Sequence, residues 1–423
     1  MTISDPLRAF AETLPSGWQL LPFGAMLSAP LRNGIYKPTE FHGRGVRVVN
    51  MGELFGFDFI SGQEMKRVEL TADEEQKSGL NDGDLLFARR SLVLEGAGKC
   101  SLVVRPVEAL TFESSIIRAR PDRRIAEPRF LFYLFLSPLG RSIVGSIATR
   151  TAVSGIRGSD LAQLGLPLPP LRVQRQIACI LSAYDEMIEN IQRRIRTLEA
   201  IARAVYRDWF IRLRFPGHEE FPRVSSSVGD IPKGWQVMQL GEIAENVRRS
   251  VRKGALKAPQ PYVGLEHIPR RSLALDAWET TTDLGSNKLQ FKTGEVLFGK
   301  IRPYFHKVSV APFDGLCSAD TIVVRARRPE HYAFVVACLS SDEFVAHASA
   351  TSNGSKMPRA NWDVLEKYRV LIPNGKVADQ FSALVADIIA QQQTLIFQTH
   401  NLRQTRDLLL PRLLSGQLEM RPH

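Results

Sequence analysis

The chain has 423 residues, of which 44% are hydrophobic and 23% are charged, the composition of a globular protein with material for two to four domains. Lys and Arg outnumber Asp and Glu by 55 to 44, and the formal charge of +11 favours a polyanionic partner, most often nucleic acid; the alternative is a basic but inert surface. The most apolar run, Phe130–Leu136, is far too short to cross a bilayer, and the first residues lack a signal-peptide pattern. We therefore expect a cytoplasmic protein without a membrane segment.

A long-range repeat organises the chain. "LPSGWQLLPFG" at 14–24 returns as "IPKGWQVMQLG" at 231–241, "NDGDLLFARR" at 81–90 as "KTGEVLFGKIR" at 292–302, and "SDLAQLGLPLP" at 159–169 as "DVLEKYRVLIP" at 363–373. The offset shrinks from 217 to 211 to 204 residues, which indicates shorter loops in the second copy of one framework. A period of this length is too long for a solenoid and predicts a duplicated domain.

Each copy is predicted to be a mixed domain that ends in a long helix. Short β-rich runs bounded by Gly, Pro and charge lie at 83–90, 99–106 and 114–120, and again at 294–303, 307–312 and 319–326. A helical run follows in each copy, at 127–148 with a break near Pro138 and at 329–349. We therefore expect an α+β fold with two duplicated domains.

The run from Pro167 to Phe210 predicts one long helix. Its apolar residues alternate in steps of four and three over about five heptads, at Ile177, Leu181, Tyr184, Ile188, Ile191, Ile195, Leu198, Ala202, Val205 and Trp209. The same pattern returns 204 residues later at Phe381, Val385, Ile388, Leu395, Leu402, Leu409 and Leu413, with Gln392, Thr399 and Arg406 between them. We call these positions the apolar seam. Such a narrow stripe predicts a partner helix.

The two helices are expected to pack against each other as an antiparallel coiled coil. The polar residues Gln392, Thr399 and Arg406 would cost stability and fix the register of the pair. The alternative is that the second helix lies only on its own domain.

Four motifs in order resemble those of the specificity subunits of Type I restriction–modification systems, and the resemblance runs from Leu14 to Leu418. They are "LPLPPLRVQRQIACILSAYDE", "TLEAIARAVYRDWF", "GSKMPRANW" and "LRQTRDLLLPRLLSGQL". The resemblance implies two target recognition domains that bind the two halves of a split, asymmetric site in double-stranded DNA. It implies that the conserved spacer helices set the gap between the half-sites.

The resemblance also implies partners. Methyltransferase subunits would dock on the chain and carry S-adenosylmethionine, and a motor–nuclease subunit would use ATP and Mg. The chain itself would bind no cofactor and catalyse nothing. The expected boundaries are target recognition domain 1 at 1–170, central spacer helix at 171–214, linker at 215–230, target recognition domain 2 at 231–373 and C-terminal spacer helix at 374–418.

The residues favour a binding protein independently of the resemblance. The sequence has no Walker A motif, no HExxH, no GxSxG and no Asn/Asp-Pro-Pro-aromatic stretch, and its four cysteines form no CxxC pair for a metal. A self-contained nuclease or methyltransferase with its own reader is the alternative. An RNA-binding or purely structural coiled-coil protein would explain the charge and the helices, but not duplicated domains with divergent loops.

Basic residues on predicted loops are the candidates to contact DNA, although each could also be an ordinary solvated charge. The first domain offers Arg44, Arg47, Arg89, Arg90, Arg150 and Arg157, and the second offers Arg248, Arg249, Arg252, Lys253, Lys257, Lys300, Arg302, Lys356 and Arg359. Lys and Arg on loops contact phosphates and position the protein, while a few side chains reach base edges. Because the loops of the two copies differ, we expect the half-sites to differ.

Overall fold

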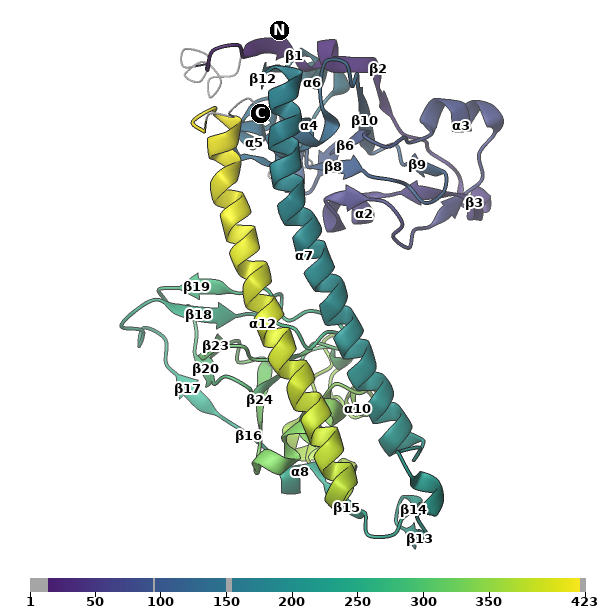
Figure 1. The fold of residues 1–423 in the computed structure, drawn as a ribbon, viewed down its shortest axis with the longest axis vertical. Helices are drawn as coiled ribbons and strands as arrows, with labels where there is room; N and C mark the ends of the chain where they lie inside the picture. Colours follow the sequence, from purple (N-terminus) through teal and green to yellow (C-terminus); the bar gives the residue numbers. More distant parts are fainter. Residues whose placement is uncertain (1–13, 94–95, 150–153, 419–423) are drawn as a thin grey trace. The chain divides into compact units, whose positions relative to one another are not determined.

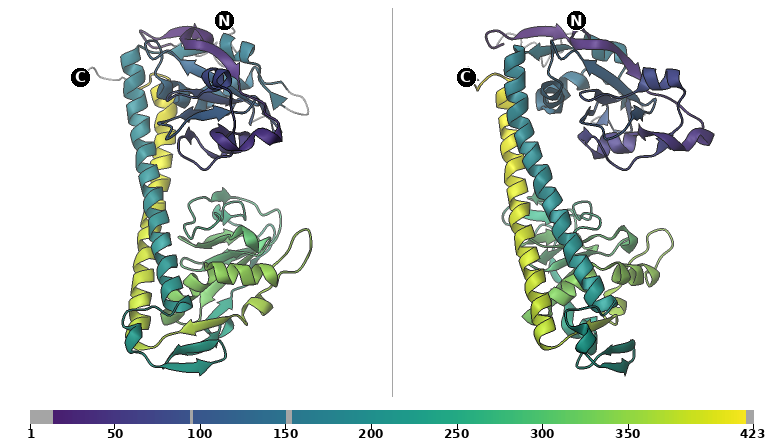
Figure 2. Two further views of the ribbon diagram at one scale, coloured as in Figure 1. Left: turned by 90° about the vertical axis from the view of Figure 1, so that its right-hand side faces the viewer. Right: turned by 45° about the vertical axis from the view of Figure 1, so that its right-hand side comes forward.

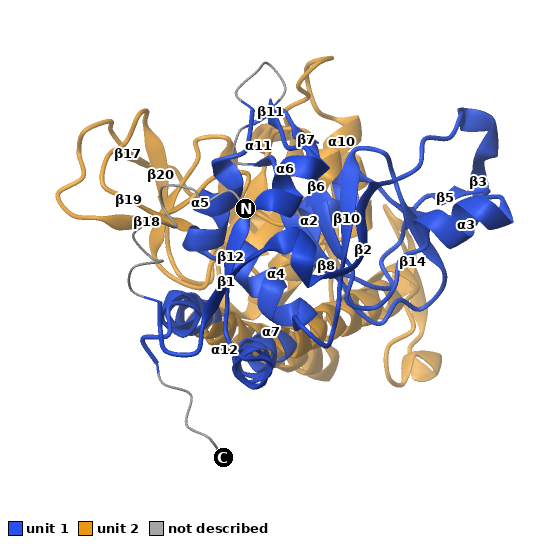
Figure 3. Cartoon of the chain, turned by 90° about the horizontal axis from the view of Figure 1, so that it is seen from above, with its two compact units in different colours: residues 1–186, 403–423 blue, residues 187–402 orange. Residues whose placement is uncertain are grey.

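A computed structural model describes residues 14–93, 96–149 and 154–418. The chain divides into two compact units, residues 1–186 with 403–423 (unit 1) and residues 187–402 (unit 2), which are coloured separately in Figure 3. Each unit holds one mixed domain and part of two long helices, which confirms the predicted α+β fold. In the described part of the chain, no helix combines the length and the apolarity that crossing a membrane requires.

The main sheet of unit 1 has the strand order β2-β10-β6-β8-β4. Its strands are β2 (Leu27–Asn33), β10 (Ile116–Pro121), β6 (Leu85–Ala88), β8 (Cys100–Val103) and β4 (Phe59–Ile60). The strands β6 and β8 are buried along their whole length. Helix α4 (Pro128–Leu136) covers the sheet with aromatic rings, and the centroids of Phe87 and Phe135 lie 4.9 Å apart. This edge-to-face packing explains why the run is so apolar.

The main sheet of unit 2 repeats the first four strands of this order and, within the described residues, has no counterpart of β4. Its order is β16-β24-β21-β22, with β16 (Ala244–Asn246), β24 (Thr321–Ala326), β21 (Val296–Gly299) and β22 (Val308–Val310). In both units a strand near the start of the domain pairs antiparallel with its last strand: β1 (Gln19–Pro22) with β12 (Gly165–Leu168), and β15 (Gln236–Gln239) with β25 (Arg369–Ile372). The three strands predicted in each copy are present, and the duplication is confirmed in the fold.

The predicted helical runs are broken at equivalent positions for different reasons. In unit 1, Pro138 begins α5 (Pro138–Gly145), and the Ser137 hydroxyl accepts a hydrogen bond from the Gly140 N–H. In unit 2, α9 (Tyr332–Leu339) and α10 (Asp342–Ala350) are separated without a proline. There the Ser341 hydroxyl accepts from the Phe344 N–H. An N-cap serine is thus the feature that both copies share.

Each unit adds a second sheet that the sequence did not predict. In unit 1 it comprises β5 (Arg67–Val68), β3 (His42–Val49) and β9 (Leu110–Phe112), next to α2 (Met51–Gly56) and α3 (Ala72–Ser78). In unit 2 it comprises β17 (Arg249–Val251), β20 (Lys288–Phe291), β23 (Gly315–Cys317), β18 (Gln260–Val263) and β19 (Glu279–Thr281). The copies therefore share one framework and differ in the sheet attached to it.

The long helices are α7 (Leu171–Tyr206), which ends in a π-helical turn at Arg207–Ile211, and α12 (Gly375–Leu414). Figures 1 and 2 show them side by side within each unit. In unit 1, Ile177 near the start of α7 packs with Leu413 near the end of α12. In unit 2, Ile195 packs with Leu395, and Tyr206 packs with Phe381. Every seam position is buried or half-buried, so the predicted antiparallel pairing is confirmed.

Two buried polar side chains of α7 attach the helix to the domain in its own unit. The Gln174 side chain accepts a hydrogen bond from the Glu127 N–H at 2.8 Å and donates to the Pro169 carbonyl at 2.8 Å. In unit 2 the Glu199 carboxylate, only 2% exposed, accepts from the N–H groups of Leu273 at 2.7 Å and Ala274 at 3.1 Å. Helix and domain are therefore joined by specific bonds in each unit.

The segment 215–230, for which the sequence suggested only a linker, contains regular structure. β13 (Arg223–Ser226) and β14 (Gly229–Pro232) form an antiparallel hairpin. Gly229, with a φ of +103°, adopts a backbone conformation at the turn that other residues rarely tolerate. Phe215, just before this hairpin, is buried and its ring lies 4.9 Å from that of Trp235.

Candidate nucleic-acid interface

Two loops of unit 2, at 300–307 and 351–361, together carry four of the predicted DNA-binding residues: Lys300, Arg302, Lys356 and Arg359. We call them the basic loops. Backbone hydrogen bonds join them, from the Ala360 N–H to the Lys300 carbonyl at 2.9 Å and from the Arg302 N–H to the Pro358 carbonyl at 2.8 Å. The Arg302 guanidinium also donates to the Lys356 carbonyl at 3.4 Å. The fold therefore gathers cations that lie more than 50 residues apart in sequence.

A surface depression beside the basic loops combines cations with amides. It is lined by Arg248, Lys300 and Arg359 and by Asn246, Asn353 and Asn361. Lys and Arg bind phosphates and guanine acceptors, whereas the Asn amide can pair with the edge of adenine. The groups needed to hold a backbone and to read a base therefore occur in one place.

The basic cluster that begins at Arg248 divides into two kinds of residue. Arg248, Arg252, Lys253 and Lys257 are exposed. Arg249 instead forms an ion pair with Glu295, a carboxylate whose side chain is 6% exposed. Glu295 also accepts a hydrogen bond from the Lys292 N–H at 2.8 Å. A buried carboxylate requires a counterion, so Arg249 has a structural role that the sequence did not reveal.

Arg89 in unit 1 and Lys300 in unit 2 make equivalent backbone hydrogen bonds. The Arg89 N–H donates to the Ser115 carbonyl at 2.9 Å, and the Arg89 carbonyl accepts from the Ile156 N–H at 3.0 Å. The Lys300 N–H donates to the Asp320 carbonyl at 3.0 Å, and the Lys300 carbonyl accepts from the Ala360 N–H. Two basic residues predicted independently thus occupy one position of the repeat.

The remaining predicted residues of unit 1 have different surroundings. Arg90, in β7 (Arg90–Ser91), and Arg157, before α6 (Gly158–Gln163), are exposed on either side of β11 (Ser154–Gly155), which pairs with β7. Arg150 lies outside the described residues. In the second sheet Arg44 pairs with Glu69, whose pKa is lowered chiefly by that hydrogen bond, and Arg47 pairs with Glu108.

Sequence reasoning missed the polar and apolar neighbours of these cations. It did not single out the amides Asn246, Asn353 and Asn361 in the depression. It also missed the exposed apolar side chains next to the basic residues, Leu92 in unit 1 and Tyr304 in unit 2. The available signal was the run "KIRPYF", in which two aromatic residues follow two cations within six positions.

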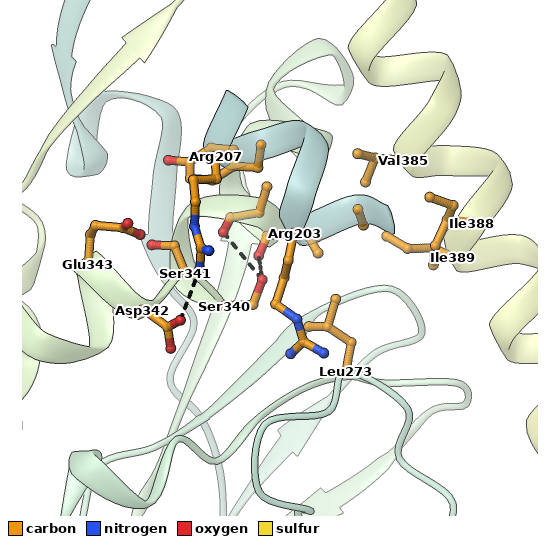
Figure 4. A pocket seen from close by; sticks show the side chains of 14 residues that line it. Arg203, Arg207, Leu273, Ser340, Ser341, Asp342, Glu343, Val385, Ile388 and Ile389 are labelled. Atoms are coloured by element: carbon orange, nitrogen blue, oxygen red, sulfur yellow. Dashed lines mark hydrogen bonds and ion pairs between the residues drawn. The ribbon is translucent and has the colours of Figure 1, made fainter. Parts of the chain in front are cut away.

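An apolar pocket of unit 2, between α7, α12 and the break that separates α9 from α10, is shown in Figure 4. At its edge the Arg207 guanidinium pairs with Asp342 at 3.3 Å. The hydroxyls of Ser340 and Ser341 donate to backbone carbonyls of Val336 and Cys338, each at 2.8 Å. These serines stabilise helix ends. The His306 ring hydrogen-bonds at 2.9 Å to the Ser340 carbonyl and not to a serine hydroxyl, so the pocket lacks the serine–base pair of a hydrolytic site.

No three His, Cys, Asp or Glu side chains gather as metal ligands in residues 14–93, 96–149 and 154–418. The duplicated frame, the two different basic surfaces and the paired long helices define a class of protein, a DNA-recognition scaffold. Known proteins give this class a more specific identity.

Residues 44–200 match the family model described as the Type I restriction modification DNA specificity domain. The chain is 25% identical over 400 residues to the Type I restriction enzyme MjaIX specificity subunit of Methanocaldococcus jannaschii, across 91% of this chain and 89% of that one. It is 21% identical to the HindI specificity subunit of Haemophilus influenzae, across 88% and 94% of the two chains. Over about nine tenths of its length, the chain is therefore similar to specificity subunits of Type I restriction–modification systems.

The fold agrees with this family. The crystal structure of the Type I restriction–modification S subunit from M. genitalium aligns with a TM-score of 0.57 and 15% identity, over 94% of this chain and 96% of that one. The names of these relatives and of the matched domain support a role in DNA recognition, and they do not favour the alternative of a self-contained enzyme.

Proposed function

We propose that the chain reads a split, asymmetric site in double-stranded DNA, one half with each target recognition domain, and directs the other subunits of a Type I complex to it. The domains would span 1–170 and 231–373, the spacer helices 171–214 and 374–418, with the linker at 215–230. One observation carries the proposal. Arg89 and Lys300 make equivalent backbone hydrogen bonds in the two units, but the side chains around them differ.

The two units differ in surface chemistry at corresponding places of the repeated fold. A depression in unit 1 is lined by Asn33 at the end of β2 and by Gly158 and Ser159 at the start of α6. The depression of unit 2 has Arg248 just after β16 and Trp362 at the start of α11 (Trp362–Leu365). A neutral surface in one unit and a cationic surface in the other would select different bases, which supports a non-palindromic site.

The phosphate contacts that position the domains would come from the basic residues of both units. For unit 1 we propose Arg89, Arg90, Arg150 and Arg157. For unit 2 we propose Arg248, Arg252, Lys253, Lys300, Arg302, Lys356 and Arg359, with Arg249 acting mainly through Glu295. Lys and Arg on loops make such contacts without reading sequence.

The paired helices would set the distance between the half-sites. A helix of forty residues is about 60 Å long at 1.5 Å per residue, under two turns of B-DNA at roughly 34–36 Å per turn. The ion pair between Asp185 and Arg406 supports a fixed register, because a slipped pairing would leave both charges buried without partners.

The partners would supply the chemistry in the cytoplasm, where chromosomal DNA is accessible. Methyltransferase subunits would bring S-adenosylmethionine, and a motor–nuclease subunit would bring ATP and Mg. The chain would contribute position and specificity.

Methylation mapping tests the proposal. The chain and its co-encoded methyltransferase subunit are expressed in a host that lacks DNA methylation, and modified bases are located by sequencing. We expect one split motif with two different halves, absent when the methyltransferase subunit is expressed alone. An intact complex that methylates nothing, or that methylates a palindrome, would contradict it.

A further inference from the structure

We propose that Leu92 in unit 1 and Tyr304 in unit 2 are apolar wedges, which insert against the base pairs of bound DNA. This inference rests on the proposed function and extends it from phosphate contacts to the interior of the duplex. Side chains of this kind partly unstack a base step and thereby place the protein at one depth in the groove.

Both side chains are unusually exposed for their type. Leu92 is 87% exposed, more than any other large hydrophobic residue in the described part of the chain, and its neighbour Val93 is 58% exposed. Tyr304 is 55% exposed, and Met357 on the facing basic loop is 49% exposed. Apolar side chains left in water at one place commonly mark a binding surface.

The two positions correspond in the duplicated framework. Leu92 lies in the connection between β6 and β8, and Tyr304 in the connection between β21 and β22. The connections close with the same backbone bond, from the Ala88 N–H to the Lys99 carbonyl and from the Gly299 N–H to the Lys307 carbonyl, both at 2.9 Å. Exposed apolar residues at the tips of two equivalent hairpins indicate a shared role.

The surroundings of Tyr304 hold its ring in place. The ring meets that of Phe305 edge-on, with centroids 4.9 Å apart. Cations cover Phe305, with the Arg270 guanidinium 4.1 Å and the Arg302 guanidinium 5.9 Å from its centroid. Arg302 and His306, with φ values of +49° and +53°, bracket the turn. Such conformations are costly and occur where function requires a fixed geometry.

Charge identifies DNA as the occupant. Arg89 and Arg90 lie three and two residues before Leu92. Lys300 and Arg302 lie four and two residues before Tyr304, and Arg302 donates to the Lys356 carbonyl on the other basic loop. A surface that binds another protein usually has few lysines around its apolar centre. Nucleic-acid-binding proteins often combine the two kinds of side chain found here. Apolar or aromatic side chains contact the bases, and neighbouring cations neutralise the phosphates.

The test separates wedges from phosphate contacts by their dependence on salt. The full chain is purified with its methyltransferase subunit, and binding to a duplex with the mapped motif is measured at several salt concentrations. Leu92→Ala and Tyr304→Ala should each weaken binding about tenfold at every salt concentration. The salt slope should stay unchanged, because no counterion-releasing contact is lost. Tyr304→Phe keeps the ring and should bind as the original chain does.

Val107→Ala and Val228→Ala are the matched controls, since these side chains are 69% and 46% exposed but belong to other segments, Val107 between β8 and β9 and Val228 between β13 and β14. They should not alter binding. Full affinity in both Leu92→Ala and Tyr304→Ala would overturn the proposal. So would loss of the methyltransferase subunit from these variants, which would make the tips a protein-docking surface. If the original complex showed no site-specific binding at all, the proposed function itself would fail.

Discussion

Arg406 of α12 and Asp185 of α7 form an ion pair, with the Arg406 guanidinium 2.5 Å from one carboxylate oxygen. The Tyr133 hydroxyl of α4 donates to the other oxygen at 2.5 Å. Burial, together with the negative charge of Asp185, raises the pKa of Tyr133 well above its ordinary value, so the phenol remains a donor. One carboxylate therefore connects both long helices of unit 1 to the domain beside them.

Arg406→Ala should lower the free energy of unfolding by about 3 kcal/mol, because it leaves Asp185 buried without its counterion. The double variant Asp185→Leu with Arg406→Leu should recover most of this loss, since a packed apolar pair avoids the desolvation of two charges. Thermal and denaturant unfolding measure both. A double variant as unstable as the single one would show that the pair matters for more than its charges.

Glu199→Ala should loosen the loop that contains Leu273 and Ala274, because their N–H groups lose a buried acceptor, at a cost of about 2–3 kcal/mol. Hydrogen exchange at these two amides is the direct measurement and should accelerate strongly. Glu189→Ala on the exposed face of the same helix is the control. Equal protection in Glu199→Ala and Glu189→Ala would contradict this attachment.

Lys356→Ala and Arg252→Ala should each weaken DNA binding for all sequences alike and reduce the salt slope by about one. Both side chains are exposed, and their removal should leave the unfolding transition unchanged. Arg328→Ala is the matched control, because Arg328 is exposed and belongs to another segment, directly before the 3-10 turn at Pro329–His331. An unaltered slope would remove Lys356 or Arg252 from the interface.

Arg249→Ala should behave differently from its neighbours. The variant leaves Glu295 buried and unpaired, so we expect a loss of about 3 kcal/mol of stability. Adding Glu295→Gln should restore part of it, because a neutral amide costs less to bury. If Arg249→Ala kept full stability but showed a reduced salt slope, Arg249 would instead contact the DNA phosphates.

Removing one heptad from each long helix, residues 187–193 and 397–403, should shorten the gap in the methylated motif while both half-sites keep their bases. The deleted length is about 10 Å, or roughly three base pairs. The deletion keeps the Asp185–Arg406 pair and the residues Ile195 and Leu395, and it removes Ile191 and Leu402 from the same apolar cluster. Methylation sequencing reads the gap, and an unchanged gap with altered bases would disprove the spacer role.

The framework was predictable from sequence because its signals are periodic or repeated. The apolar seam from Ile177 to Trp209 could be identified from the spacing of its residues alone. The strands around Leu85 and Val296 could be identified because the same pattern occurs in both copies of the repeat. The second sheets were not predictable, since strands such as β5 and β17 are two or three residues long and are formed by tertiary pairing.

The candidate site was predictable only as a set of charges. The position of Arg89 and Lys300 followed from the repeat. Sequence spacing could not show that Arg249 would meet Glu295, 46 residues further on. Nor could it show that Leu92 would be left in water, because exposure depends on contacts between distant segments.

The Arg89 guanidinium donates to the Ser114 carbonyl at 3.5 Å, but the bonds that Arg89 and Lys300 share are made by their main-chain N–H and carbonyl groups. Any side chain compatible with an extended backbone can therefore be exchanged there without breaking them. New DNA specificities can arise by single substitutions on an unchanged scaffold, and the host can diversify what it recognises without first having to preserve the fold through compensating mutations.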